Sequence, residues 1–171
     1  MIISSSTMLL RLSILISFFG LIPLSVQGFQ LEIVNGSGKF GLIDRSSGET
    51  ILNKNYEEIG WNEGILINEQ LRAKKNQRWA LFNSKGKAVT AHEFLTLRPH
   101  NSDQFIASKM LSNSILQQFG TIDRKGKVII PFEYLSITSA GDRLLATFKL
   151  DNELVQTLLD AKGKALIKGF H

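Results

Sequence analysis

Short runs of apolar residues, separated by Gly, Asn and Asp, recur along the chain after residue 28. Four of them, at 40–44, 79–83, 119–123 and 156–160, are versions of one segment, and a glycine follows each within a few residues. These glycines are Gly48, Gly86, Gly126 and Gly163, spaced 38, 40 and 37 residues apart. A period of this size is typical of modular folds in which each unit buries an apolar face against its neighbours.

Each unit is predicted to contain an A strand, a tight turn, a B strand, a B–C turn, a C strand and a closing segment. The A strands are predicted at 29–34, 65–71, 104–111 and 143–150, the B strands at 39–44, 77–83, 115–123 and 154–160, and the C strands at 49–52, 87–90, 127–130 and 164–167. Short β-rich runs between turn residues indicate an all-β protein. We expect tandem antiparallel meanders in a solenoid-like stack, with a closed four-bladed propeller as the alternative. The units are about 29–63, 64–103, 104–142 and 143–171.

The B–C turns have a common chemistry. Each begins with Asp or Asn, whose side chain can accept a backbone N–H, and ends with Gly, which takes a left-handed conformation without strain. The pairs are Asp44 and Gly48, Asn83 and Gly86, Asp123 and Gly126, and Asp160 and Gly163. We therefore interpret these acids as structural turn residues rather than catalytic ones.

The closing segments carry an aromatic residue at a constant place. Tyr56, Phe94 and Tyr134 each lie eight residues after the turn glycine. We expect these rings to fill the core between units rather than to stack on a ligand. The small residues of the B strands, which are Gly41, Ala80, Gly120 and Thr157, predict a close approach of neighbouring backbone.

The third unit carries a recognisable motif: an aromatic–Gly pair, two further residues, Asp, a turn ending in Gly, apolar residues, and then Pro-Phe-Glu-Tyr, over 119–134. With this motif the chain resembles the WG-repeat, or KWG-repeat, proteins. The second unit keeps the Trp of the motif as Trp79, whereas the fourth lacks the aromatic–Gly pair. The resemblance implies a β-rich repeat fold that serves as a binding scaffold, often in exported proteins, and it implies no catalytic residues.

The first 28 residues are interpreted as a secretory signal peptide. Arg11 is their one charged residue, 12–24 form an apolar run, and Val26 and Gly28 fit the small-residue rule for cleavage. An uncleaved membrane anchor is the alternative. Cleavage would leave one domain, 29–171, without a transmembrane span, in the periplasm or outside the cell. The chain has no cysteine, which removes disulfides, thiol nucleophiles and thiolate metal ligands.

Few residues point to catalysis. The three histidines, His92, His100 and His171, do not have metal-ligand spacing, and no serine lies in a Gly-x-Ser-x-Gly elbow. No glycine-rich phosphate loop precedes a helix. The sequence therefore predicts no metal, no cofactor and no enzymatic activity. A diverged envelope enzyme, or an enzyme inhibitor, with its site in an irregular loop such as 98–101 is the alternative function.

The B–C turns are instead rich in cations, in a chain with a net charge of +5. In a stack of like units they would form one basic stripe, composed of Arg45, Lys85, Lys87, Arg124, Lys125, Lys127, Lys162 and Lys164. Arg72, Lys74, Lys75 and Arg78 are expected to add to it from the A–B turn of the second unit. We interpret the protein as an exported scaffold that binds a protein or an anionic envelope component, and not nucleic acid. The alternative is that lysines simply keep turns soluble and protect sheet edges.

Overall fold

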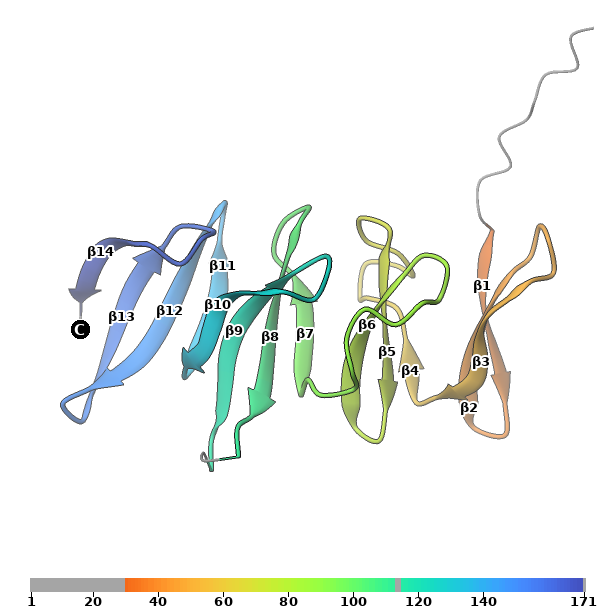
Figure 1. Cartoon of the computed structure of the whole chain (residues 1–171), viewed down its shortest axis with the longest axis horizontal. Helices are drawn as coiled ribbons and strands as arrows, with labels where there is room; N and C mark the ends of the chain where they lie inside the picture. Colours follow the sequence, from red (N-terminus) through yellow and green to blue (C-terminus); the bar gives the residue numbers. More distant parts are fainter. Residues whose placement is uncertain (1–29, 113–114, 171) are drawn as a thin grey trace, which may run out of the picture.

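The protein is an open row of four small β-sheets. The computed structural model describes residues 30–112 and 115–170, so the predicted signal peptide lies outside the described residues. Every regular element in this part is a β-strand, and it contains no helix long and apolar enough to cross a membrane. The sheets follow one another along the long axis, with β1 and β14 at opposite ends (Figure 1). The predicted all-β stack is confirmed, and the four-bladed closure is wrong.

Each sheet is built from consecutive antiparallel strands. Sheet 1 contains β1 (Leu31–Gly36), β2 (Lys39–Asp44) and β3 (Thr50–Tyr56), and sheet 2 contains β4 (Glu58–Ile59), β5 (Gln70–Lys75) and β6 (Arg78–Asn83). Sheet 3 contains β7 (Thr96–Pro99), β8 (Gln104–Met110), β9 (Gln117–Asp123) and β10 (Val128–Tyr134). Sheet 4 contains β11 (Ser136–Ala140), β12 (Arg143–Leu150), β13 (Glu153–Leu159) and β14 (Ala165–Phe170).

The closing segments link each sheet to the next. They form the short strands β4, β7 and β11, which the sequence analysis did not assign, and each pairs with the A strand of the following unit. Each places one buried aliphatic residue opposite an alanine: Ile59 opposite Ala73, Leu97 opposite Ala107, and Ile137 opposite Ala146. The hydrogen-bonded sheets are therefore offset from the repeat in the sequence by one strand.

The second unit departs most from the predicted strands. Its A strand was expected at 65–71, but β5 begins at Gln70, after a turn in which Asn68 and Glu69 have positive φ angles of 51° and 61°. The apolar residues Ile65 and Leu66 pack against the core from this loop, which explains why the run resembles a strand. The predicted C strand at 87–90 is reduced to an isolated bridge between Phe82 and Ala88.

Three separate cores lie between successive sheets. The core between sheets 1 and 2 includes Leu42 and Leu71, the next includes Trp79 and Phe105, and the last includes Ile106 and Leu144. Because side chains alternate across a strand, each internal sheet contributes to the core on either side. The fold is stabilised by these sandwiched layers rather than by one central core.

The three aromatic residues of the closing segments lie where the sequence predicted. Each packs on a ring of the following unit: Tyr56 on Phe82 at 5.7 Å, Phe94 on Phe132 at 6.0 Å, and Tyr134 on Phe148 at 6.2 Å between ring centroids. Aromatic pairs at such distances add to the burial of apolar surface. These rings therefore join neighbouring units.

The turn glycines make the tightest contact between units. A Cβ atom on Gly86 would lie 2.2 Å from the carbonyl oxygen of Ile51 in the preceding unit. The same atom on Gly126 would lie 2.9 Å from the Thr90 side chain, and on Gly163 it would lie 3.1 Å from the Ile130 side chain. Each B–C turn thus rests on the C segment of the unit before it. Gly48, in the first unit, has nothing within 4 Å of such an atom.

This difference gives a matched pair of substitutions. Gly48 and Gly86 have similar φ angles, +75° and +74°, so alanine is strained at both, by about 1–3 kcal/mol. At Gly86 the Cβ atom must also push away a backbone carbonyl. We expect Gly86→Ala to lower the free energy of unfolding clearly more than Gly48→Ala, measured by urea denaturation. Equal losses would show that the turn does not carry the contact between units.

Candidate binding surface at the B–C turns

The first side chain of each B–C turn is used to hold the turn itself. The carboxylate of Asp160 accepts backbone N–H groups from Lys162 and Lys164, both at 2.9 Å. Asp123 and Asn83 accept the corresponding N–H groups of their own turns, at 2.8 Å and at 3.0–3.1 Å. The longer first turn differs, because Asp44 accepts from the N–H and hydroxyl of Ser46, at 3.0 Å and 2.7 Å.

These hydrogen bonds favour the ionised carboxylates. The pKa of Asp160 is lowered mainly by the N–H of Lys164, and that of Asp44 mainly by the Ser46 hydroxyl. Both groups are therefore fixed acceptors at neutral pH, a state that does not suit a general acid. The charges of Lys162 and Lys164 make a smaller contribution to the lowered pKa of Asp160.

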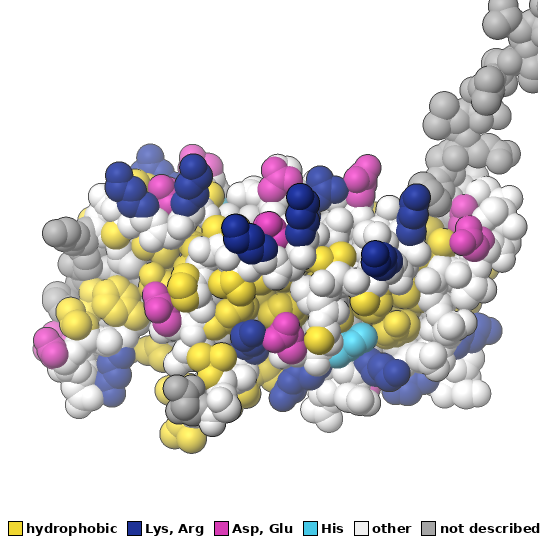
Figure 2. Space-filling view, viewed as in Figure 1, with side chains coloured by type: hydrophobic (Ala, Val, Ile, Leu, Met, Phe, Trp, Pro, Cys, Tyr) yellow, Lys and Arg dark blue, Asp and Glu magenta, His cyan; other side chains and the backbone are white. Residues whose placement is uncertain are grey.

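Six lysines of the B–C turns form two columns along the edge of the stack. They occupy the place before the turn glycine and the place after it in units two to four, and all are exposed: Lys85, Lys125 and Lys162, and Lys87, Lys127 and Lys164. Figure 2 shows Lys and Arg side chains along the edge where these turns lie. Within the described part of the chain, none of the six is in an ion pair. We call this set the lysine ladder.

The first unit does not continue the ladder. Ser47 and Glu49 occupy the two equivalent places in its turn. Packed sheets lie about 10 Å apart, so the ladder presents pairs of ammonium groups at intervals of about that length. Three consecutive units therefore offer a regular cationic edge.

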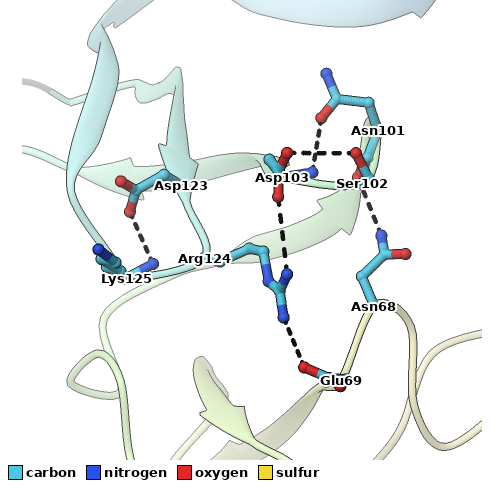
Figure 3. A network of polar contacts seen from close by, with 8 residues as sticks. All are labelled: Asn68, Glu69, Asn101, Ser102, Asp103, Asp123, Arg124 and Lys125. Atoms are coloured by element: carbon cyan, nitrogen blue, oxygen red, sulfur yellow. Dashed lines mark hydrogen bonds and ion pairs between the residues drawn. The ribbon is translucent and has the colours of Figure 1, made fainter.

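The two arginines of the predicted stripe have acidic partners. Arg45 lies 2.8 Å from the Glu32 carboxylate. Arg124 lies 3.0 Å from Glu69, in the loop before β5, and 3.8 Å from Asp103, in the loop before β8 (Figure 3). Exposed pairs of this kind contribute little energy, but they cancel the local charge. Arg124 thus connects three loops, and the free cations of the edge are lysines.

Shallow hollows lie between consecutive turns. One, of about 430 Å³, is lined by Gln70, Asp103, Asp123, Arg124 and Lys125. Gln104 at the next hollow donates to the carbonyl oxygen of Ala161 at 2.9 Å and to the Thr121 hydroxyl at 2.6 Å. Gln70 occupies the equivalent place in unit two, where Leu81 replaces Thr121, and its buried Oε1 has no hydrogen-bond partner among the described residues.

The four cations predicted for the A–B turn of unit two lie elsewhere. Arg72, Lys74, Lys75 and Arg78 belong to strands β5 and β6, because the turn itself is Asn76 and Gln77. Arg72 stacks 4.0 Å from the ring centroid of Trp79 and donates to the carbonyl oxygens of Gly60 and Leu97. This contact was not predicted, because Arg72 and Leu97 are far apart in the chain.

Two arginines protect the edges of the closing strands β7 and β11. Arg72 donates to Leu97 on β7, and Arg98 donates to Ile137 on β11. An edge strand exposes unpaired carbonyl groups that would otherwise invite another strand. Burial lowers the pKa of Arg72 from its usual value, while Glu58 and Glu63 act in the opposite direction. Arg72 therefore serves structure and does not belong to the ladder.

The histidines do not complete a catalytic set in the described structure. His100 Nδ1 lies 2.9 Å from the Ser139 hydroxyl, and no side chain of the described residues forms a hydrogen bond with its buried Nε2. In a catalytic triad the second ring nitrogen donates to a carboxylate. Burial lowers the pKa of both His100 and His92. Across residues 30–112 and 115–170, no three His, Asp or Glu side chains gather as metal ligands do.

Comparison with protein families matches one segment of the chain. Residues 119–140, which contain nearly all of β9 and the whole of β10 and β11, match the family model described as WG containing repeat. No curated protein matches the chain. The match falls on the unit that carries the best copy of the motif.

The role of Asp160 can be tested by how the stability of the protein depends on pH in acid. Because its pKa is lowered in the folded protein, this group stabilises the fold above its unfolded pKa, and the effect disappears as pH falls through the folded pKa, below about pH 5. Asp160→Asn keeps an acceptor, as Asn83 does in unit two, but does not titrate. We expect it to flatten the acid dependence of thermal unfolding, whereas Asp160→Ala should destabilise the protein at neutral pH. Identical profiles for all three proteins would contradict this role.

Proposed function

We propose that this WG-repeat protein is a non-enzymatic scaffold that binds an anionic polymer of the cell envelope along the lysine ladder. The observation that carries the proposal is the recurrence of two exposed lysines at equivalent places in three consecutive units. A solubility role alone does not require lysines at the same two places of each turn.

The arrangement suits a long ligand better than a small one. Gly86, Gly126 and Gly163 rest on the C segment of the preceding unit, so the spacing of the lysines is set by the stack and not by flexible loops. Each exposed charge contributes a small energy, but several held in one row act together on a polymer with repeated negative charges. The hollows between turns are shallow, which fits recognition of a chain passing across them.

The neighbouring acidic groups form no ion pair with these lysines among the described residues. Asp123 and Asp160 are engaged by backbone N–H groups of their own turns, and Glu69 and Asp103 pair with Arg124. The lysine side chains are left available to an external anion. The same occupation of the carboxylates argues against acid–base chemistry at this edge, which favours a scaffold over the alternative of an enzyme.

The cellular place of the ligand depends on export. We propose that the chain is cleaved after Gly28 and that the mature protein begins at Phe29, because Val26 and Gly28 fit the cleavage rule. N-terminal sequencing of protein recovered from the periplasm or medium should begin at Phe29. Material that begins at Met1 and stays with the membrane would identify the segment as an anchor.

The lysine ladder is tested by charge reversal with a matched control. Lys85→Glu, Lys125→Glu and Lys162→Glu together should weaken binding to polyglycerol phosphate and to alginate by about tenfold or more, since each exposed charge contributes up to about 1 kcal/mol. The control combines Lys54→Glu, Lys75→Glu and Lys149→Glu. These exposed lysines lie near the A–B hairpins and give the same change in net charge.

Binding of the wild-type protein should weaken as salt rises, because exposed charges are screened beyond about 8 Å at physiological ionic strength. The control triple variant should retain most of the affinity. Equal losses of affinity in the two variants would show that net charge alone explains binding. Unchanged binding in the ladder variant would show that the lysine ladder is not the binding surface.

A further inference from the structure

Sheets 1, 3 and 4 each carry a row of three residues on the face directed toward the β14 end of the stack, whereas sheet 2 has Arg72 at the corresponding place on its A strand. One residue comes from each of the A, B and C strands, and the three are paired across the strands. The rows are Ile33, Leu42 and Leu52 in sheet 1, Ile106, Thr121 and Ile130 in sheet 3, and Leu145, Leu158 and Ile167 in sheet 4. We call each of these sets a forward row.

The forward row of sheet 3 is closed by sheet 4. Ile106 and Ile130 pack with Leu144 and Ala146 of sheet 4 in the third core, and Ile130 is 1% exposed. Thr121, between them, is fully buried. The forward row of a unit is therefore an interface built to receive another β-sheet.

The forward row of sheet 4 has the same construction but is open. Ile167 is 50% exposed, whereas Ile130 at the equivalent place is 1% exposed. Leu158 and Leu145 are partly exposed, although Thr121 and Ile106 are fully buried. Leu154, on the same side of β13 as Leu158, is also exposed. Within the described residues, no element covers this aliphatic surface.

The other end of the stack is constructed differently. In sheet 1, Glu32 on the A strand lies opposite Ile43 on the B strand. The equivalent A-strand residues of the other sheets are Leu71, Phe105 and Leu144, and all three are buried. The Glu32 carboxylate lies 2.8 Å from Arg45. An ion pair therefore replaces the apolar side chain that would face a preceding unit. Repeat proteins commonly protect a terminal unit with such a polar face.

We propose that the forward row of sheet 4 binds the same row of a second copy of this chain, giving a two-fold dimer. The three residues of the row are aliphatic, so two copies bury apolar surface along the row. The exposed Lys149, paired with Leu154 on the same face, lies toward the β12–β13 hairpin and away from the row. A head-to-tail contact would instead place this row over Glu32 and Arg45 and remove their ion pair from water, which is costly. Association therefore closes at two copies, and the lysine ladders stay exposed at the edges of the dimer.

The test is the oligomeric state of the purified protein, measured by analytical ultracentrifugation over a range of concentrations. The wild-type protein should sediment as a concentration-dependent dimer. Ile167→Glu should raise the dissociation constant by about tenfold or more, because it places a charge within the apolar interface. Leu150→Glu is the matched control, since Leu150 is 54% exposed but lies at the tip of the β12–β13 hairpin.

A milder substitution at the same position controls for the loss of folding that Ile167→Glu could cause. Ile167→Thr keeps a β-branched residue in β14 and should weaken the dimer while the circular dichroism spectrum is unchanged. A wild-type protein that stays monomeric at every concentration would overturn the proposal. So would a dimer that Ile167→Glu and Leu150→Glu weaken equally.

The polar end supplies a second, independent readout. Glu32→Leu introduces the residue found at the equivalent place in sheets 2 and 4, so each copy would then have two apolar ends. We expect this variant to form species larger than a dimer. If wild-type association is head-to-tail, charge reversal by Glu32→Lys should disrupt it. That outcome would overturn the two-fold arrangement, which predicts an unchanged dimer.

Discussion

The stack depends on the contact between each B–C turn and the C segment of the preceding unit. At Gly86 this contact is so close that the carbonyl oxygen of Ile51 occupies the space a side chain would need. A turn that rests on backbone cannot slide without losing the fit, so the contact sets the position of each sheet relative to the one before. The buried rows, the aromatic pairs and the spacing of the lysines all follow from that position.

The same turn performs two tasks because the backbone N–H groups and the side chains of its lysines have different surroundings. The N–H groups of Lys162 and Lys164 donate inward to Asp160, which fixes the turn. Their side chains are exposed and available to solvent or to a ligand. Structure therefore uses the carboxylate and leaves the ammonium groups free, which explains how a turn required for folding can also present a binding surface. In unit two Asn83 holds the turn without a charge, which leaves Lys85 and Lys87 without a nearby turn carboxylate.

The sequence predicted those features that are set by neighbouring residues. The B strands, the turn glycines and the aromatic positions are local patterns, and they are found where expected. The closing strands β4, β7 and β11 were missed because they are short and their partners lie in the next unit. The partners of Arg124 were missed for a similar reason, since Glu69 and Asp103 lie in two different loops brought together by stacking. In unit two, Ile65 and Leu66 are apolar for packing rather than for strand pairing, which a single sequence cannot distinguish.

The outer faces of sheets 1 and 4 carry different side chains. In sheet 1, Glu32 stands where the other sheets have a buried apolar residue, and its carboxylate forms an ion pair with Arg45. In sheet 4, the aliphatic forward row keeps the form of an internal interface. If both outer faces were apolar, copies could add without limit and form fibres. In the proposed two-fold dimer, the Glu32–Arg45 ion pair in sheet 1 and the aliphatic row of sheet 4 would together restrict self-association to a closed pair. This difference between the two outer sheets is a physical reason to treat the aliphatic row as a specific interface.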